Sequence, residues 1–453
     1  MTDLTTTPTP GGKRHSYGSL LDESPRTKKR NAAETRFRVY GVIAISIGLI
    51  FLAALLFAIV RNGIPAFTQT YIVMDVELTA AKLDKKGNRD IEDIKKVSTF
   101  GYNPLIGTAL ETLVAENGVE TEINKGKELR DMLSSGAAAQ VRFAVIDNPD
   151  LIGTTQEFTL LAGSRVDGYM KGRVDRESLA RDPNLSPAHL DIVDALAADG
   201  TIKRIFNWDF ITGTDASESR PEQAGMGVAI LGSFFMMLVV LLLSLPIGVA
   251  ASIYLEEFAP QNMFTDFIEV NISNLAAVPS IVFGILGLAV FIQFAHLPQS
   301  APIVGGLTLT LMTLPTIVIS TRASLKSVPP SIRSAALGVG ASKMQSVFHH
   351  VLPLAMPGIL TGTIIGLAQA LGETAPLLLI GMVGYIATNY PDGVASGFLD
   401  PNSAMPAQIF EWAKRADPAY YERAWGGIII LLVFLLTMNL IAILLRRRFE
   451  RRW

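Results

Sequence analysis

The chain has 453 residues, of which 49% are hydrophobic and only 18% are charged, and its formal net charge at pH 7 is −2. Soluble domains carry more charge, and the apolar residues here are gathered into long runs. The composition therefore predicts an integral membrane protein. The absence of cysteine excludes disulfides, thiolate metal sites and cysteine nucleophiles.

The N-terminal region is predicted to be a tail followed by a membrane span. Residues 1–38 are rich in Thr, Pro and Ser and then basic, with the run Arg26–Arg30, which is typical of a disordered basic tail. Residues 39–61 contain the apolar run Gly41–Val60, which is long enough to cross a bilayer as a helix. The long basic lead and the length of this run argue against a cleaved signal peptide.

Residues 62–223 are polar and mixed, and they are predicted to form an α+β insert domain outside the bilayer. Residues 71–78 and 141–146 resemble strands, and residues 104–116 and 187–198 resemble helices. The last of these has Ser186 as its expected N-cap and Pro187 at the first helical position.

Residues 224–453 are predicted to be a membrane core with five more transmembrane helices, giving six in an all-α polytopic membrane protein. Four of these runs contain proline, which neighbouring helices can accommodate in a membrane. The expected spans are residues 229–254, 275–294, 304–321, 358–384 and 426–445.

Six spans place both termini on one side of the membrane. Both termini are strongly basic, so both are expected to lie in the cytoplasm. The expected location is the inner, cytoplasmic membrane of the cell, with the insert domain on the extracytoplasmic side. Residues 255–271 disagree, because this expected cytoplasmic loop has four acidic residues and no Lys or Arg. Acidic residues carry little weight in this rule.

The expected cytoplasmic loop at residues 329–353 contains two apolar patterns with helical spacing. The first is Ile332, Ala335, Ala336 and Val339, and the second is Met344, Val347, Phe348 and Val351. Gly338 and Gly340 separate them. Two helices this short are unstable alone, so they require a partner surface.

This loop resembles the EAA loop of ABC importer permeases, which implies that it sits in a groove on an ATPase subunit and transmits its closure. An ordinary interfacial helix pair is the alternative. The usual Glu is replaced by Ser334, and a position usually filled by Ile is His350. The residues that match the coupling motif positions are Ser334, Ala335, Ala336, Gly340, Leu352 and Pro353.

Further motifs, in order from residue 207 to the C-terminus, resemble phosphate permeases of the PstA type. They include Asn207–Phe210, Tyr254–Pro260, Asn274–Gly284, Gly372–Pro376 and Pro406–Phe410. The resemblance implies a type I ABC importer permease that works with a second permease of the PstC type and two ATPase subunits. It also implies an extracytoplasmic phosphate-binding protein and inorganic phosphate as cargo. The insert domain is not part of that common core.

Candidate pathway residues are Glu373, Thr374, Gln369 and Arg322. A carboxylate inside a span is costly, so Glu373 is expected to face the bundle interior or a wet path. A purely structural buried carboxylate is the alternative. Gln369 stands where many relatives have Arg. Arg322 is either a pathway cation or a residue that extends to the interface.

No phosphate-binding loop of the Gly-x-x-x-x-Gly-Lys-Ser/Thr type occurs, so the chain is predicted not to be an ATPase or any other enzyme. Its histidines are scattered, and neither a metal site nor a cofactor is expected. Two other functions remain open. One is a permease for sulfate or molybdate, and the other is a membrane sensor that uses residues 62–223.

Overall fold

The computed structural model describes residues 25–449 except 85, 120–122, 124, 180–181, 183–184 and 383–389. The expected disorder of residues 1–24 lies outside the described residues. The chain divides into two compact units, residues 1–58 and 59–453, which are considered separately.

The first unit consists of most of helix α1 (Pro25–Gly63), which contains the predicted span. Residues 26–56 of this helix are exposed. Residues 25–38, expected to belong to a disordered tail, are helical. Their Lys, Arg, Ala and Glu residues favour a helix that continues from the apolar run.

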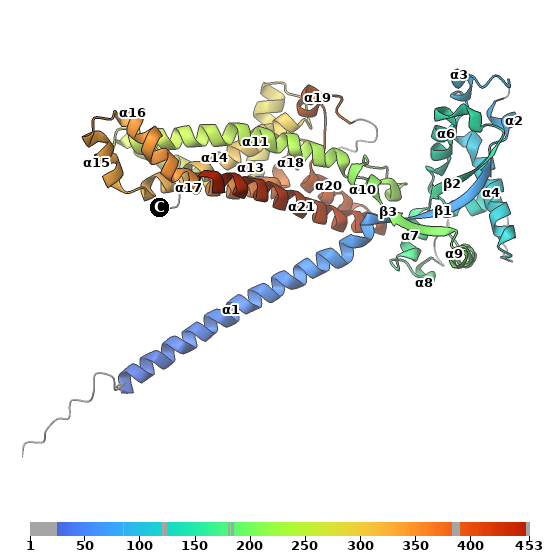
Figure 1. Ribbon diagram of the computed structural model, residues 1–453, viewed down its shortest axis with the longest axis horizontal. Helices are drawn as coiled ribbons and strands as arrows, with labels where there is room; N and C mark the ends of the chain where they lie inside the picture. Colours follow the sequence, from blue (N-terminus) through green and yellow to red (C-terminus); the bar gives the residue numbers. More distant parts are fainter. Residues whose placement is uncertain are drawn as a thin grey trace, which may run out of the picture. The chain divides into compact units, whose positions relative to one another are not determined.

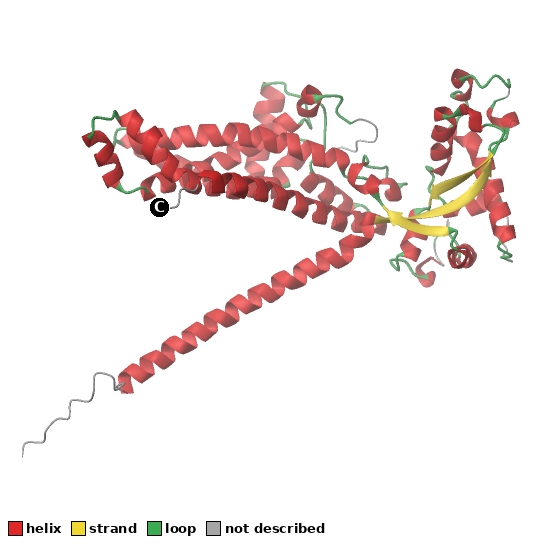
Figure 2. Ribbon diagram, viewed as in Figure 1, coloured by secondary structure: helices red, strands yellow, loops and turns green. Residues whose placement is uncertain are grey.

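The insert domain is built on a three-stranded antiparallel sheet in the order β2-β1-β3 (Figure 2). Tyr71 of β1 is opposite Leu161 of β2, and Thr68 is opposite Phe206 of β3. The strands are β1 (Thr68–Glu77), β2 (Thr155–Leu161) and β3 (Ile202–Phe206). The surrounding helices are α2 (Ala80–Leu83), α3 (Ile91–Ile94), α4 (Asn103–Glu116), α5 (Gly126–Leu129), α6 (Ala137–Asp147), α7 (Ser164–Met170), α8 (Arg176–Leu179), α9 (Pro187–Asp199) and α10 (Trp208–Thr212).

The predicted helices α4 and α9 and the strand β1 are confirmed, but the strand predicted at residues 141–146 is wrong. That run lies in α6, where Ala137, Ala138, Val141 and Val145 are buried on one face. The apolar run alone was too short to distinguish the two periodicities.

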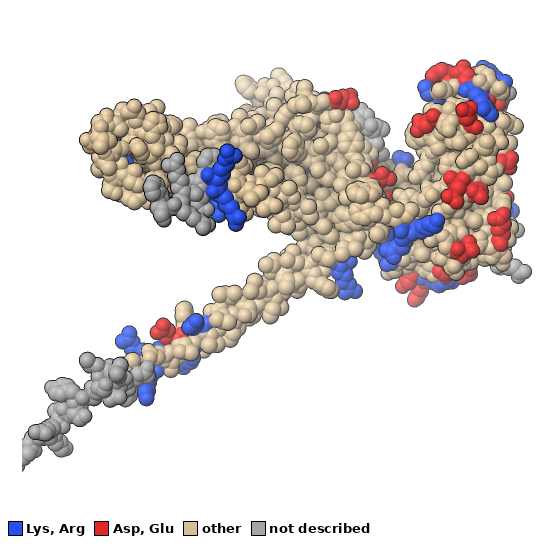
Figure 3. All heavy atoms as spheres, viewed as in Figure 1, with Lys and Arg blue, Asp and Glu red and all other residues tan. Residues whose placement is uncertain are grey.

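The core contains α11 to α21, and its elements are long and apolar. Among the described residues, five helices, of which α1 is one and the other four belong to the core, can cross a membrane by length and composition; a bent pair in the core makes six when it is counted as a span. Its surface in Figure 3 is almost free of charged side chains, whereas the insert carries many. The helices are α11 (Gly227–Ile253), α12 (Met263–Ala276), α13 (Ser280–Gly287), α14 (Pro302–Ser327), α15 (Pro330–Gly338), α16 (Lys343–Ser346), α17 (Leu352–Gly372), α18 (Ala375–Leu379), α19 (Val394–Leu399), α20 (Met405–Lys414) and α21 (Pro418–Phe449).

Two predicted spans are interrupted. The third is not one straight helix, because Met263–Ala276 and Ser280–Phe294 are bent by 101° around a break that contains Pro279. The fifth was expected to continue to Gly384, but α17 ends at Gly372 and a short helix begins at Ala375. Residues 383 and 384 lie outside the described residues. Interrupted helices at membrane depth are tolerated where protein or a wet cavity surrounds the backbone.

A row of glycines brings α14 and α17 close together. A Cβ on Gly358 would overlap Ser324 Oγ, and one on Gly362 would overlap Ser320 Oγ. A Cβ on Gly366 would lie 3.0 Å from Thr313 Cγ2. Small residues at this spacing allow helices to pack tightly in a bilayer.

Buried charges join the insert domain to the head of α21. Lys171 Nζ lies 2.8 Å from Glu422 Oε1 and 2.7 Å from Asp167 Oδ2, and Arg173 also pairs with Glu422. The next residue, Arg423, donates to Gln69 Oε1 over 2.7 Å and to the Glu222 carbonyl over 2.9 Å. The insert domain and the core are therefore held together by buried ion pairs, and separating them would leave uncompensated charges.

Candidate functional site: the loop between α14 and α17

The loop lies at the end of the core opposite the insert domain (Figure 1). Helix α15 ends at Gly338, and Gly340 turns the chain with a φ of +90°. Ser342 then caps α16, because its N–H donates to Gln345 Oε1 and its Oγ accepts from the Gln345 N–H. Helix α16 continues through the π-helical turn Val347–Val351 into α17. The second short helix predicted here is therefore the beginning of the long helix Lys343–Gly372.

The two halves of the loop present apolar side chains outward. The exposed fractions of Leu337, Val339 and Met344 are 50%, 85% and 57%. In contrast, Val347 and Val351 are buried together with Leu325 and Val328 at the end of α14. The loop is thus packed underneath and apolar at its tip, and an exposed tip of this kind indicates a protein surface as its partner.

Arg333 fastens α15 to the ends of two spans. Its NH2 nitrogen lies 2.6 Å from Glu257 Oε1, and its Nε lies 3.0 Å from the same oxygen. The guanidinium also donates to the carbonyls of Val328 and Leu325 over 2.8 and 2.9 Å. A planar guanidinium can satisfy this carboxylate and both carbonyls together, which Lys cannot do.

A second set of ion pairs lies one turn further into α14. Arg322 contacts Glu269 Oε1 at 2.6 Å and Glu256 Oε2 at 3.4 Å. Lys326 lies 3.6 Å from the same Glu256 oxygen. Three of the four acidic residues in 255–271, Glu256, Glu257 and Glu269, are therefore paired with cations of α14 and α15.

The six motif residues occupy different environments. Ser334 and Ala335 are exposed, and Ser334 Oγ donates to the Pro330 carbonyl over 3.2 Å. Ala336 is buried under α15, and Leu352 and Pro353 are half-buried in the long helix. Nothing lies within 4 Å of a Cβ placed on Gly340, so its positive φ is what favours glycine there.

The four pathway candidates do not form one cluster. Glu373 is half-buried at the C-terminal end of α17, Thr374 precedes α18, and Gln369 is exposed one turn earlier. Arg322 lies near Ser320, which packs on Gly362. Glu373 follows Gly362 by eleven residues, about 16 Å along a helix. Arg322 and Glu373 are therefore too far apart to be ion-pair partners.

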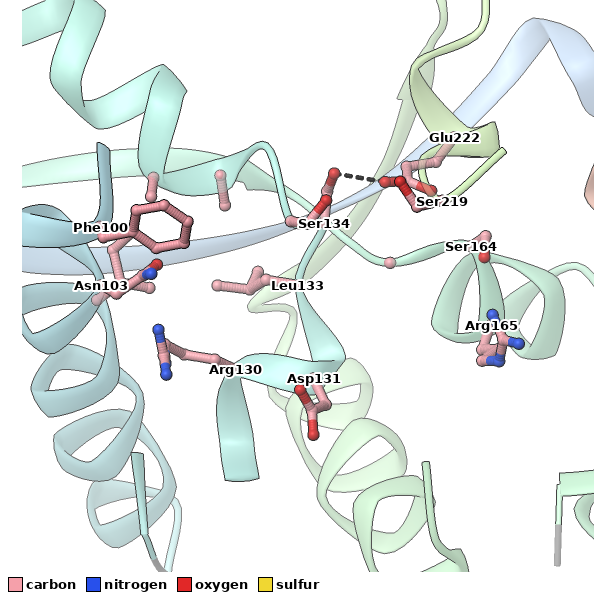
Figure 4. Close-up of a pocket in the computed structure, with 15 residues that line it drawn as sticks. Phe100, Asn103, Arg130, Asp131, Leu133, Ser134, Ser164, Arg165, Ser219 and Glu222 are labelled. Carbon is pink, nitrogen blue, oxygen red and sulfur yellow. Dashed lines mark hydrogen bonds between the residues drawn. The ribbon is translucent and has the colours of Figure 1, made fainter. Parts of the chain in front are cut away.

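A separate polar cavity of about 410 Å³ lies in the insert domain (Figure 4). Arg130, Asp131 and Ser134 line it, together with Glu222 from the segment that leads into α11. Glu222 is 6% exposed and accepts a hydrogen bond from Ser134 Oγ. Burial raises the pKa of its carboxyl above the usual value of 4.5. The sequence analysis missed this cavity because its walls come from distant segments.

Comparisons of the sequence with known proteins identify relatives of the core. Residues 244–453 match the binding-protein-dependent transport system inner membrane component family, and residues 24–180 match a domain of unknown function (DUF3333). The probable ABC transporter permease protein YqgI of Bacillus subtilis (strain 168) is 31% identical over 246 residues, covering 52% of this chain and 82% of that protein. A chain of the inward-facing MetNI methionine ABC transporter is 15% identical with a TM-score of 0.37, covering 50% of this chain and 95% of that chain.

The chain therefore belongs to the family of binding-protein-dependent transport system inner membrane components. It is a multi-pass permease subunit and not an enzyme. Among its relatives is the phosphate transport system permease protein PstA 1 of Mycobacterium tuberculosis (strain CDC 1551 / Oshkosh), which is 33% identical over 236 residues, 51% of this chain and 74% of that protein. The resemblance to PstA-type permeases that the motifs indicated is confirmed.

Proposed function

We propose that this chain is a membrane-spanning subunit of an ATP-driven importer of inorganic phosphate. Relatives named phosphate transport system permeases support the cargo. The absence of a phosphate-binding loop from the sequence is consistent with ATP hydrolysis by separate subunits. The expected assembly contains this chain, a second permease of the PstC type, two ATPase subunits and an extracytoplasmic phosphate-binding protein.

The observation that carries the proposal is the form of the loop between α14 and α17. Its apolar tip, Leu337, Val339 and Met344, is exposed, whereas Arg333 and the buried valines fix its base to the spans. A rigid base with an apolar tip transmits force from a partner into α14 and α17. We infer that an ATPase subunit covers this tip and that its closure moves both helices.

The proposed orientation places this loop and the C-terminal end of α21 in the cytoplasm and the insert domain outside. The loop and the insert lie at opposite ends of the core (Figure 1). The basic residues at the end of α21, Arg446–Arg448, are on the proposed cytoplasmic side, as the positive-inside rule requires.

We also propose that Glu373 lies beside the phosphate path. It sits in the interruption between α17 and α18, and interrupted helices form substrate sites in many transporters. Its carboxylate repels phosphate, so a gating role fits better than direct binding. Gln369, one turn away, has an amide that can donate to an anion.

The proposal is tested by phosphate-stimulated ATP hydrolysis in vesicles that contain the complete complex. Inorganic phosphate with its binding protein is expected to stimulate hydrolysis, and sulfate and molybdate are not. Stimulation by sulfate alone would reassign the cargo. A complex in which ATPase subunits do not associate with this chain would favour the sensor function instead. Radiolabelled phosphate uptake in cells with and without the chain gives an independent measurement.

A further inference from the structure

The strand β3 is exposed on both faces, although it carries apolar side chains. Ile205 and Phe206 are 43% and 44% exposed, and Trp208, which follows directly, is 67% exposed. Ile64, in the turn after α1, is 54% exposed beside them. An exposed apolar edge strand is a liability in water, because it promotes aggregation. We name the following exposed residues the interfacial edge: Ile64, Lys203, Arg204, Ile205, Phe206 and Trp208.

The interfacial edge is rigidly connected to the buried core. The ring of Trp208 packs edge-on against Phe206 with centroids 4.7 Å apart, and Phe206 stacks on Phe67 at 6.4 Å. Phe67 in turn contacts the fully buried Phe210 at 5.3 Å. The position of the exposed rings is therefore set by the fold and not by a loose loop.

Contacts with α21 fix the height of this edge relative to the spans. A Cβ on Gly426 would lie 2.5 Å from Ala66 Cβ and 2.8 Å from Phe210 Cε1. Gly426 is the residue at which the apolar run of α21 begins. Phe67 and Phe206 therefore lie at the level where that span leaves the hydrocarbon core.

Basic side chains accompany the aromatic ones. Lys203 and Arg204 are consecutive exposed residues of β3, and Lys and Arg side chains are visible over this strand in Figure 3. Neither has an ion pair among the described residues. Aromatic rings with basic neighbours are characteristic of the membrane–water interface, where rings lie among headgroups and cations contact phosphates.

We propose that the interfacial edge inserts into the lipid headgroup layer at this end of the spans, with Lys203 and Arg204 bound to lipid phosphates. The bilayer is favoured over a protein partner because the rings of the edge connect through Phe67 and Phe210 to Gly426, where the apolar run of α21 begins. The insert domain then rests on the membrane through β3 as well as on α21. This inference requires only that α21 spans the bilayer, so it is independent of the cargo.

The test uses the full chain in phospholipid nanodiscs with single spin labels, which is straightforward because the natural chain has no cysteine. The test variants are Trp208→Cys and Phe206→Cys. Phe143→Cys in α6, 59% exposed, is the aqueous control, and Leu440→Cys in α21, 56% exposed, is the lipid control. Collisions with oxygen, which concentrates in lipid, are compared with collisions with a water-soluble nickel chelate.

Labels at 206 and 208 are expected to lose most of the nickel accessibility seen at 143 while remaining accessible to oxygen, as at 440. Nickel accessibility equal to that at 143 would overturn the inference, because the edge would then lie in water. Protection from both reagents would also overturn it, because a protein would then cover the edge. Tryptophan fluorescence provides a second measurement that needs no label, and the natural chain is compared with the Trp208→Phe variant. The Trp208 component should be quenched by lipids brominated near the headgroup and not by aqueous iodide.

Discussion

Replacing Arg333 with Met should detach α15 from the spans without unfolding the core. The Glu257 side chain is 7% exposed and that of Arg333 is 24% exposed. Removing the cation strands a nearly buried carboxylate and frees two carbonyls. Breaking a fully buried pair costs about 3–5 kcal/mol, and the partial exposure of Arg333 reduces this cost to about 2–3 kcal/mol. A change of that size shifts the equilibrium between attached and detached α15 by roughly 30- to 150-fold.

The assay for Arg333→Met is phosphate-stimulated ATP hydrolysis and uptake in the reconstituted complex, with the amount of chain in the membrane measured alongside. Uptake should fall by at least about tenfold while the chain stays in the membrane. Lys326→Met is the matched control, since Lys326 is 60% exposed and 3.6 Å from Glu256, and such a pair contributes less than about 1 kcal/mol. Unchanged coupling in Arg333→Met would refute the idea that this residue holds the loop in its working position.

Three further changes test other parts of the structure. Gly362→Val should separate α14 from α17 and destabilise the chain by about 1–3 kcal/mol; Ser320→Gly in the same chain should recover part of the loss, measured by thermal unfolding in detergent. Gly340→Val should reduce uptake through its positive φ, at a cost of about 1–2 kcal/mol, whereas Gly340→Asn should retain more activity because Asn tolerates that conformation; equal uptake would show that φ is unimportant. Burial raises the pKa of Glu222, so the folded chain holds this proton more tightly than the unfolded chain does. The contribution of Glu222 to stability should therefore be fully present below about pH 4.5 and be lost as the pH rises through the folded-state pKa; Glu222→Gln should remove this contribution from a plot of melting temperature against pH.

Long apolar runs and local capping signals were sufficient to predict much of the fold. The long apolar runs of α11, α14 and α21 predict membrane-spanning helices. A helix is the expected form because a bilayer core offers no water, so every backbone N–H and C=O must be hydrogen-bonded within the protein. Pro187 and Ser186 marked the start of α9 for a similarly local reason. The loop at residues 329–353 was found from its spacing, although its second half is part of a longer helix.

Features that depend on distant residues could not be predicted. Nothing local showed that Arg322 would pair with Glu256 and Glu269, which precede it by 66 and 53 residues. β3 also escaped prediction, because only Ile202 in it is buried and the strand shows no inside–outside alternation. Glu373 was placed within a helix because its neighbours are apolar, yet the chain leaves the helix at Gly372.

The joint between Lys171, Arg173 and Glu422 has a consequence for protein engineering. Excising residues 70–206 to make a minimal permease would leave Glu422, which is 5% exposed, without Lys171 and Arg173. Arg423 would keep its hydrogen bonds to Gln69 and to the Glu222 carbonyl. A shortened chain would therefore need a neutral replacement at position 422, for example Glu422→Gln, before it could be expected to fold. The insert domain thus neutralises a buried carboxylate of α21, and it cannot be excised without a compensating change in that helix.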